Sequence, residues 1–278
     1  MITYGIIGYG FVGRAMRQFE CELNNVLIYD INPELCSPKN ISIEHINSVC
    51  DIIFICVPTP MNKDGSCHLN IVENVISQLN KNKVIIKSTV PVGTSKRLEC
   101  SFSPEFLTEK NFMEDIKNCN NWIFGINESN ESHVLKSNIT SLINNAYNCN
   151  KILNNEITYL NTNEAELIKY FRNAFLATKV SFCNEISEFC KYKNIDYEII
   201  RKYGASDDRI NLHHTLVPGH DGLTGFGGTC LPKDCNSLYH QMLNVNMKSY
   251  IIKNVLARND EVDRKDADWK NDVGRTVV

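Results

Sequence analysis

The segment from Gly225 to Asp234 holds the side chains best suited to chemistry. It reads Gly-Phe-Gly-Gly-Thr-Cys-Leu-Pro-Lys-Asp, with a thiol at Cys230, an ammonium at Lys233 and a carboxylate at Asp234. A nearby ammonium favours the nucleophilic thiolate and can stabilise an oxyanion, and a carboxylate can move protons or position water. The three glycines allow the backbone to approach a ligand closely. The segment therefore predicts covalent catalysis at Cys230, whereas the other eleven of the 12 cysteines are expected to be structural.

A second pattern begins the chain. Gly8-Tyr9-Gly10-Phe11-Val12-Gly13 is a G-x-G-x-x-G motif directly after an apolar run. Such glycines permit a tight turn, close approach to a pyrophosphate and packing of a helix on a strand. Asp30 ends the next apolar run, where its carboxylate can bind ribose hydroxyls. Because this carboxylate would repel a 2′-phosphate and no Arg directly follows it, we expect the cofactor to be NAD.

Short apolar runs alternate with helical stretches in the first part of the chain, which predicts α/β architecture with a Rossmann-type, doubly wound parallel sheet. The expected strands include residues 6–7, 26–29, 52–57, 84–86, 122–126 and 157–160. We place an NAD-binding domain at residues 1–161 and a helical domain, which carries the catalytic Cys, at residues 162–278.

A long helix is expected from residue 164 to 193 at least, about 45 Å in length, with Asn163 as its N-cap and Glu166 three residues on. Apolar residues recur along it at helical spacing: Leu167, Phe171, Ala174, Phe175, Phe182, Ile186 and Phe189. A helix this long has more apolar surface than a small domain can cover. We therefore expect it to form the centre of a helical domain and to be shared with a second copy in a homodimer.

Lys169 and Asn173 lie four residues apart on this helix, so they share one face, about opposite to Leu167 and Phe171. A Lys and an Asn directed at one point can hold an oxyanion and a water. The alternative is a solvated polar face without a catalytic role.

Six segments, in order, resemble motifs of the UDP-glucose/GDP-mannose dehydrogenase family. They are Cys56–Pro60 (CVPTP), Ser88–Thr94 (STVPVGT), Ser103–Leu107 (SPEFL), Ala165–Leu176, Asp208–Ile210 (DRI) and Gly225–Asp234, the last departing only at Leu231. The resemblance implies catalytic roles for Cys230, Lys169, Asn173, Lys233, Asp234, Glu105 and Thr89. It implies that Val57, Pro58, Thr59, Thr89 and Lys233 join the glycine-rich motif and Asp30 in the cofactor site. Substrate contacts are implied for Glu105, Phe106, Leu107, Lys169, Asn173, Arg209, Phe226, Gly227, Gly228 and Cys230.

The resemblance also implies a reaction, the oxidation of UDP-glucose to UDP-glucuronate with two NAD. In it Cys230 forms a thiohemiacetal with the intermediate aldehyde and then a thioester, which water hydrolyses. The usual family architecture has a third, C-terminal domain that helps hold the nucleotide. This sequence stops before such a domain, so we expect a short form.

The composition of the chain argues against several other classes of protein. A net charge of −3 argues against a nucleic-acid partner, and no apolar run approaches the roughly 18 residues of a membrane span. No Cys/His set has zinc spacing, so no metal is expected. Because the first residues carry no secretory signal, we expect a cytoplasmic protein.

Three other functions stay open at this point. The first is a dehydrogenase of another sugar nucleotide, such as UDP-N-acetylmannosamine or GDP-mannose. The second is a two-electron β-hydroxyacid dehydrogenase, a class that lacks a Gly-Phe-Gly-Gly-x-Cys segment. The third is a nucleotide-binding protein without turnover.

Overall fold

The computed structural model describes all 278 residues, which separate into two compact units. Unit 1 comprises Met1–Thr59 and Leu69–Lys169, and unit 2 comprises Pro60–His68 and Tyr170–Val278. The first residues of the long helix thus group with unit 1, because Glu166 and Lys169 bond to its loops. Each unit is described by itself below.

Unit 1 is built on a seven-stranded sheet with the order β2-β1-β3-β4-β5-β6-β7. Its strands are β1 (Ile2–Ile7), β2 (Asn24–Tyr29), β3 (Ile52–Ile55), β4 (Val84–Ile86), β5 (Ser101–Phe102), β6 (Trp122–Ile126) and β7 (Ile157–Asn161). The first five strands are parallel, whereas β6 pairs antiparallel with β5 and β7 runs parallel to β6. The predicted Rossmann-type sheet is confirmed, with two strands at one edge running in the opposite direction.

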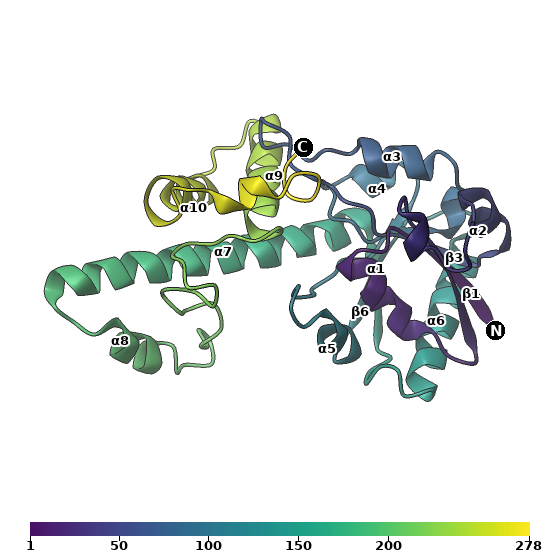
Figure 1. The fold of residues 1–278 in the computed structure, drawn as a ribbon, viewed down its shortest axis with the longest axis horizontal. Helices are drawn as coiled ribbons and strands as arrows, with labels where there is room; N and C mark the ends of the chain where they lie inside the picture. Colours follow the sequence, from purple (N-terminus) through teal and green to yellow (C-terminus); the bar gives the residue numbers. More distant parts are fainter. The chain divides into compact units, whose positions relative to one another are not determined.

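Apolar side chains on alternating strand positions fill two cores, one on each face of this sheet. Tyr4 and Ile6 of β1 belong to one cluster, and Ile7 belongs to the other. The helices of unit 1 surround the sheet in Figure 1. They are α1 (Phe11–Met16), α2 (Ile43–Val49), α3 (Asn70–Ile76), α4 (Thr94–Arg97), α5 (Phe112–Lys117) and α6 (Ser132–Asn148), with short 3-10 turns at Arg17–Phe19, Pro33–Leu35 and Lys81–Lys83.

The long helix α7 (Thr162–Lys193) runs without interruption from unit 1 into unit 2 (Figure 1). The predicted capping box at Asn163 and Glu166 is wrong, since the reciprocal hydrogen bonds form two residues earlier. Asn161 Oδ1 accepts from the Glu164 backbone N–H, and Glu164 Oε2 accepts from the Asn161 N–H. Glu166 is instead fully buried in unit 1.

Unit 2 packs three further helices and two short turns with the rest of α7. These are α8 (Tyr197–Gly204), α9 (Leu231–Asn244), α10 (Ile251–Arg258), the π-helical turn η4 (Asn259–Asp263) and the 3-10 turn η5 (Asp268–Asn271). Tyr170, Ala174 and Ala177 of α7 enter the core of the unit together with Phe226 and Leu238. No helix of the chain has both the length and the apolar character needed to cross a membrane.

Apart from Tyr170, the large apolar side chains at the start, middle and end of α7 lie outside this core. Leu167, Phe171, Phe175, Phe182 and Phe189 are all exposed, Phe171 to 67%. The rings of Phe171 and Phe175 stack with centroids 6.4 Å apart. The helix thus buries Tyr170 and two alanines in the core of unit 2 and leaves most of its large apolar side chains exposed in a single chain.

Candidate functional site

The three glycines of the N-terminal motif have three different surroundings. Gly8 has a φ of +92°, and a Cβ there would lie 2.8 Å from the Cys56 carbonyl group. A Cβ at Gly13 would lie 2.1 Å from the Gly8 carbonyl oxygen, so helix α1 can pack closely on the turn only with glycine. Gly10, by contrast, faces open space, with nothing within 4 Å of its would-be Cβ. The turn therefore leaves room where a pyrophosphate must approach the backbone, as a dinucleotide requires.

Asp30 is placed at the end of β2, beside this turn. Its Oδ2 accepts from the Tyr9 backbone N–H at 2.6 Å, and its Oδ1 accepts from the Asn32 N–H at 2.9 Å. Each carboxylate oxygen has a second lone pair, so Asp30 can still accept from ribose hydroxyls. The carboxylate thus fixes the turn and stays available to a ligand.

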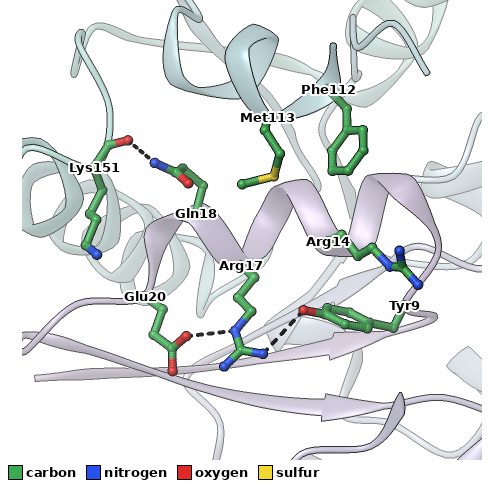
Figure 2. A pocket seen from close by; sticks show the side chains of 8 residues that line it. All are labelled: Tyr9, Arg14, Arg17, Gln18, Glu20, Phe112, Met113 and Lys151. Carbon is green, nitrogen blue, oxygen red and sulfur yellow. Dashed lines mark hydrogen bonds and ion pairs between the residues drawn. The ribbon is translucent and has the colours of Figure 1, made fainter. Parts of the chain in front are cut away.

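A pocket of about 360 Å³ flanks the turn, and Figure 2 shows its lining. It is lined by Tyr9, Arg14, Arg17, Gln18, Glu20, Phe112, Met113 and Lys151. The Arg14 guanidinium lies 5.9 Å from the centroid of the Tyr9 ring, and Arg17 bonds to both the Tyr9 hydroxyl and Glu20. Two arginines and a lysine against one carboxylate make this flank positive, which favours approach of a phosphate group. Arg14 and Arg17 were not predicted as site residues, although Arg14 directly follows the motif and Arg17 lies in the 3-10 turn after α1.

The loops after β3 and β4 are joined by hydrogen bonds. The Thr59 hydroxyl donates to the Thr89 carbonyl at 2.9 Å, and the Ser88 hydroxyl donates to the Val57 carbonyl at 2.6 Å. Thr59 and Thr89 are buried, and Pro58 is exposed between Val57 and Thr59. The predicted cofactor residues therefore form one connected pair of loops at the carboxyl ends of the strands, where α/β sheets bind ligands.

Glu105 and Lys169 form a buried ion pair in unit 1. Lys169 Nζ lies 2.6 Å from Glu105 Oε1 and donates to the Glu105 carbonyl at 2.8 Å, with side chains only 4% and 6% exposed. Glu105 Oε2 also accepts from the Leu107 N–H at 2.8 Å. Phe106 and Leu107, the predicted substrate contacts, are half-buried beside it. The SPEFL loop is therefore held by the first turns of α7.

Lys87, which the sequence analysis missed, supports the same loop. Its ammonium is buried and donates to the Pro104 carbonyl at 2.9 Å and to the Ser103 hydroxyl at 3.2 Å. Burial lowers the pKa of Lys87, and the nearby Cys56 and Glu105 oppose that effect. Lys87 directly precedes the STVPVGT motif, but lysines are rarely buried, so the sequence offered little reason to single it out.

In unit 2, Cys230 is the N-cap residue of α9, and Pro232 lies in the first turn of the helix. Its thiol is half-buried, with the Thr229 hydroxyl 3.6 Å from Sγ. Lys233 Nζ lies 2.7 Å from Asp234 Oδ1, and the Asn173 amide donates to Asp234 Oδ2 at 2.5 Å. The structure thus joins three of the predicted catalytic residues in one buried cluster at the same helix end as the thiol.

Burial, the largest single effect, would lower the pKa of Lys233, but the Asp234 carboxylate together with Cys67 and Cys230 outweighs burial and raises this pKa above its ordinary value. Cys67 and Cys230 act on Lys233 in the same direction as Asp234. Lys233 is therefore an ammonium at neutral pH. An ammonium and the N-terminus of a helix both favour a thiolate, so this is a suitable setting for a nucleophilic cysteine.

Lys169 and Asn173, predicted to share a face, have different partners. Lys169 bonds to Glu105 in unit 1, and Asn173 bonds to Asp234 in unit 2. Arg209 lies after α8 with its side chain 89% exposed and its guanidinium paired to Asp207. Phe226 is buried in the core of unit 2, and Gly228 faces open space.

A Rossmann-type dinucleotide turn and a thiol–ammonium–carboxylate cluster on a helical unit define a two-part dehydrogenase architecture. Residues 39–143 match the NAD binding domain of the UDP-glucose/GDP-mannose dehydrogenase family, and residues 163–261 match its central domain. The chain belongs to this family, and unit 1 contains its NAD-binding domain.

Individual relatives agree with this assignment. The chain is 31% identical over 231 residues to the UDP-glucose 6-dehydrogenase of Pseudomonas aeruginosa, covering 75% of this chain and 48% of that protein. A UDP-glucose dehydrogenase structure from Pyrobaculum islandicum aligns with a TM-score of 0.78 at 25% identity, covering 94% of this chain and 68% of that chain. A UDP-D-ManNAc dehydrogenase structure from Pyrococcus horikoshii shares the fold, with a TM-score of 0.73 at 19% identity over 93% of this chain and 68% of that chain. The chain spans about half the length of the Pseudomonas relative.

Proposed function

We propose that this protein is an NAD-dependent nucleotide-sugar dehydrogenase that oxidises UDP-glucose to UDP-glucuronate. The observation that carries the proposal is the Asn173–Asp234–Lys233 cluster at the N-terminal end of α9, whose N-cap residue is Cys230. The glycine-rich turn, Asp30 and the loops after β3 and β4 would hold the dinucleotide. Bound NAD would accept the hydride in each of the two oxidations.

The chain's own residues account for the remaining steps. The C6 hydroxyl of the substrate loses its proton and C6 loses a hydride, which gives an aldehyde, and the Cys230 thiolate adds to C6 of this aldehyde. Lys233 is a permanent cation and stabilises the resulting oxyanion electrostatically. Loss of a second hydride from C6 of this oxyanion, the deprotonated thiohemiacetal, gives the thioester.

Water then cleaves the thioester to give the carboxylate and to restore the thiol. Asp234 accepts from Lys233 and Asn173 through different oxygens, and its remaining lone pairs can orient this water. In unit 1, Lys169 is held against Glu105, so these two groups can pass or hold a proton as a pair. Thr89 would bind substrate or water from the loop after β4.

The stoichiometry of the reaction tests the proposal. Purified protein is given limiting UDP-glucose with excess NAD, and NADH is measured by absorbance. Two NADH per substrate support the double oxidation. One NADH per product would indicate two-electron chemistry, and none with any sugar nucleotide would indicate a binding protein. A panel with UDP-N-acetylmannosamine and GDP-mannose identifies the substrate, since the Pyrococcus structure shows that the fold also serves a ManNAc nucleotide.

Replacing the nucleophile tests the covalent route. We expect Cys230→Ser to stop the reaction before free acid is released, with steady-state turnover reduced at least 10²-fold on the scale typical of covalent catalysis. Cys149→Ser, at another half-buried thiol, is the matched control and should retain activity. An unchanged rate in Cys230→Ser would reject the covalent route.

We further propose that the protein is a homodimer. The exposed stripe Leu167, Phe171, Phe175, Phe182 and Phe189 spans most of α7, and a patch of this kind on a single chain marks an interaction surface. A second copy of the same helix would bury it.

A further inference from the structure

The three glycines that precede Cys230 do not all make room for a ligand. A Cβ at Gly225 would lie 2.5 Å from Asn259 Oδ1, and a Cβ at Gly227 would lie 2.3 Å from Cζ of Arg264. Only Gly228 has nothing within 4 Å of its would-be Cβ. Two of the three glycines are therefore needed because protein side chains occupy the space beside them.

The Arg264 guanidinium lies directly against Gly227. Besides Cζ, its Nη2 and Nε atoms would be 2.5 and 2.6 Å from a Cβ at Gly227, so the whole plane of the guanidinium faces the Cα of this residue. A methyl group at position 227 could fit only if the guanidinium or the backbone moved. Arg264 thus forms a flat surface under the loop that leads to Cys230.

Two carboxylates fix the orientation of this surface. Arg264 Nε and Nη2 donate to the two oxygens of Asp268 at 2.5 and 2.8 Å, and Nη1 lies 2.8 Å from Asp221 Oδ2. The Arg264 side chain is only 6% exposed, and the hydrogen bond to Asp268 raises its pKa. The guanidinium is therefore permanently charged and held in one plane by a fork-like pairing that Lys cannot make.

Asn259 holds the same loop one residue earlier. Its Oδ1 accepts from the Phe226 N–H at 2.8 Å, and its Nδ2 donates to the Phe226 carbonyl at 3.0 Å, with both residues buried. The loop is consequently bonded at Phe226 and supported at Gly227, three residues before the thiol. Asn259 and Arg264 belong to one short segment that begins with η4.

We propose that Arg264 is a positioning residue for Cys230: its guanidinium, oriented by Asp221 and Asp268, sets the position of the Gly227 backbone and through it the position of the thiol at the start of α9. The proposal rests on the proposed function insofar as Cys230 is the nucleophile. A displacement of about 1 Å at a reacting group can cost on the order of 10²-fold in rate. The contact between Arg264 and Gly227 should therefore affect kcat more than it affects the binding of NAD.

Charge and shape can be separated by substitution. Arg264→Lys keeps the charge and removes the planar surface, and we expect kcat to fall at least tenfold while the KM for NAD changes less than twofold. Arg201→Lys is the matched control, because Arg201 pairs with Glu198 at the surface of the same unit, and it should leave both constants unchanged. Equal kcat values for Arg264→Lys and the wild type would overturn the proposal.

A compensation experiment tests the contact itself. Gly227→Ala should lose activity at least tenfold because its methyl group meets the guanidinium, and Gly227→Ala with Arg264→Ser should lose no more than Arg264→Ser does alone. Gly204→Ala, where a Cβ meets nothing within 4 Å, is the control for the glycine substitution. Losses that simply multiply in the double variant would contradict a contact between the two positions.

The rate at which iodoacetamide alkylates Cys230, followed by peptide mass spectrometry, gives a readout that needs no turnover. We expect alkylation to slow about fivefold in Arg264→Lys and in Gly227→Ala, because a displaced thiol loses the stabilisation of its thiolate by Lys233 and the helix end. An unchanged or faster rate in these variants would overturn the proposal.

The same measurement separates the proposal from the proposed function. If the wild type shows no dehydrogenase activity but alkylation slows as expected, the proposed function fails and the positioning role stands. If circular dichroism shows that Arg264→Lys does not fold, Asp268→Asn is measured instead. This variant weakens the pairing on one side of the Arg264 guanidinium, so alkylation of Cys230 should slow to a smaller extent. No slowing in a folded Asp268→Asn would count against the proposal.

Discussion

The buried pair of Glu105 and Lys169 gives the sharpest prediction about unit 1. Nζ and Oε1 are 2.6 Å apart, and neither side chain is exposed beyond 6%. At an effective dielectric constant of about 20, two unit charges at this separation attract by roughly 6 kcal/mol before desolvation is counted. Removing only one partner leaves a buried charge, and this typically costs about 3–5 kcal/mol.

The perturbation is a double-mutant cycle with Lys169→Met and Glu105→Gln. Each single change should destabilise unit 1 by about 3–5 kcal/mol, whereas the double variant removes both charges of the pair and should be less destabilised than the sum of the two. We expect a coupling free energy of about 2–3 kcal/mol. The exposed pair of Lys136 and Glu128, 2.9 Å apart in the same unit, is the matched control and should couple by less than about 1 kcal/mol.

The assay is urea unfolding followed by tryptophan fluorescence. The chain has two tryptophans, of which Trp122 is buried in unit 1 and Trp269 is buried in unit 2. A Trp269→Phe background therefore reports unit 1 alone, which matters because a two-part protein has no single free energy of unfolding. If the Glu105–Lys169 cycle and the surface cycle gave the same coupling, the reasoning from burial would be refuted.

Two further predictions concern a buried cation and the proposed dimer. Because the pKa of Lys87 is lowered, the unfolded chain binds more protons between that lowered value and about 10.4, so the stability of the wild type relative to Lys87→Met should rise with pH across this window. The free energy of unfolding of both proteins is measured against pH with the Trp122 fluorescence signal. The same pH dependence in both would contradict this prediction. Phe175→Glu and Phe182→Glu should convert a homodimer into monomers in analytical ultracentrifugation, whereas Ile31→Glu, at a side chain that is 93% exposed in unit 1, should not. A wild-type protein that sediments as a monomer would rule out the dimer.

Much of the fold was predictable because each signal was local. The glycine-rich motif follows a strand and begins a helix as expected, and its glycines have the close contacts or open space that the motif requires. The strand directions were not predictable in the same way. An apolar run indicates burial but not direction, so the reversal of β6 and β7 could not be read from the sequence, and β5, with only two residues, carries no pattern.

The start of α7 shows how tertiary contacts decide between equivalent local signals. Asn161 with Glu164 and Asn163 with Glu166 have the same spacing, so either could form the capping box. Glu166 is withdrawn from that role because its carboxylate accepts from the Gly93 and Ser95 backbone N–H groups at 2.6 and 2.8 Å. The local sequence alone is therefore compatible with either capping box, and only the tertiary contacts of Glu166 decide between them.

The candidate site was predictable where its residues lie close together along the chain. Cys230, Lys233 and Asp234 meet at one helix end, as the segment suggested. Arg264 was missed because it lies far along the chain from the loop that it supports, and an isolated arginine is normally a surface residue. Distance along the chain, more than residue type, set the limit of the sequence analysis.

Two side chains in the first two turns of α7 bind the segments that follow two neighbouring strands of the sheet. Glu166 binds the segment after β4 and Lys169 binds the segment after β5, and both depend on the same rotational phase of the helix. A single residue inserted before Glu166 would turn both side chains by about 100° and detach them together. Divergent forms of this protein should accordingly tolerate substitutions at the start of this helix far better than changes in its length.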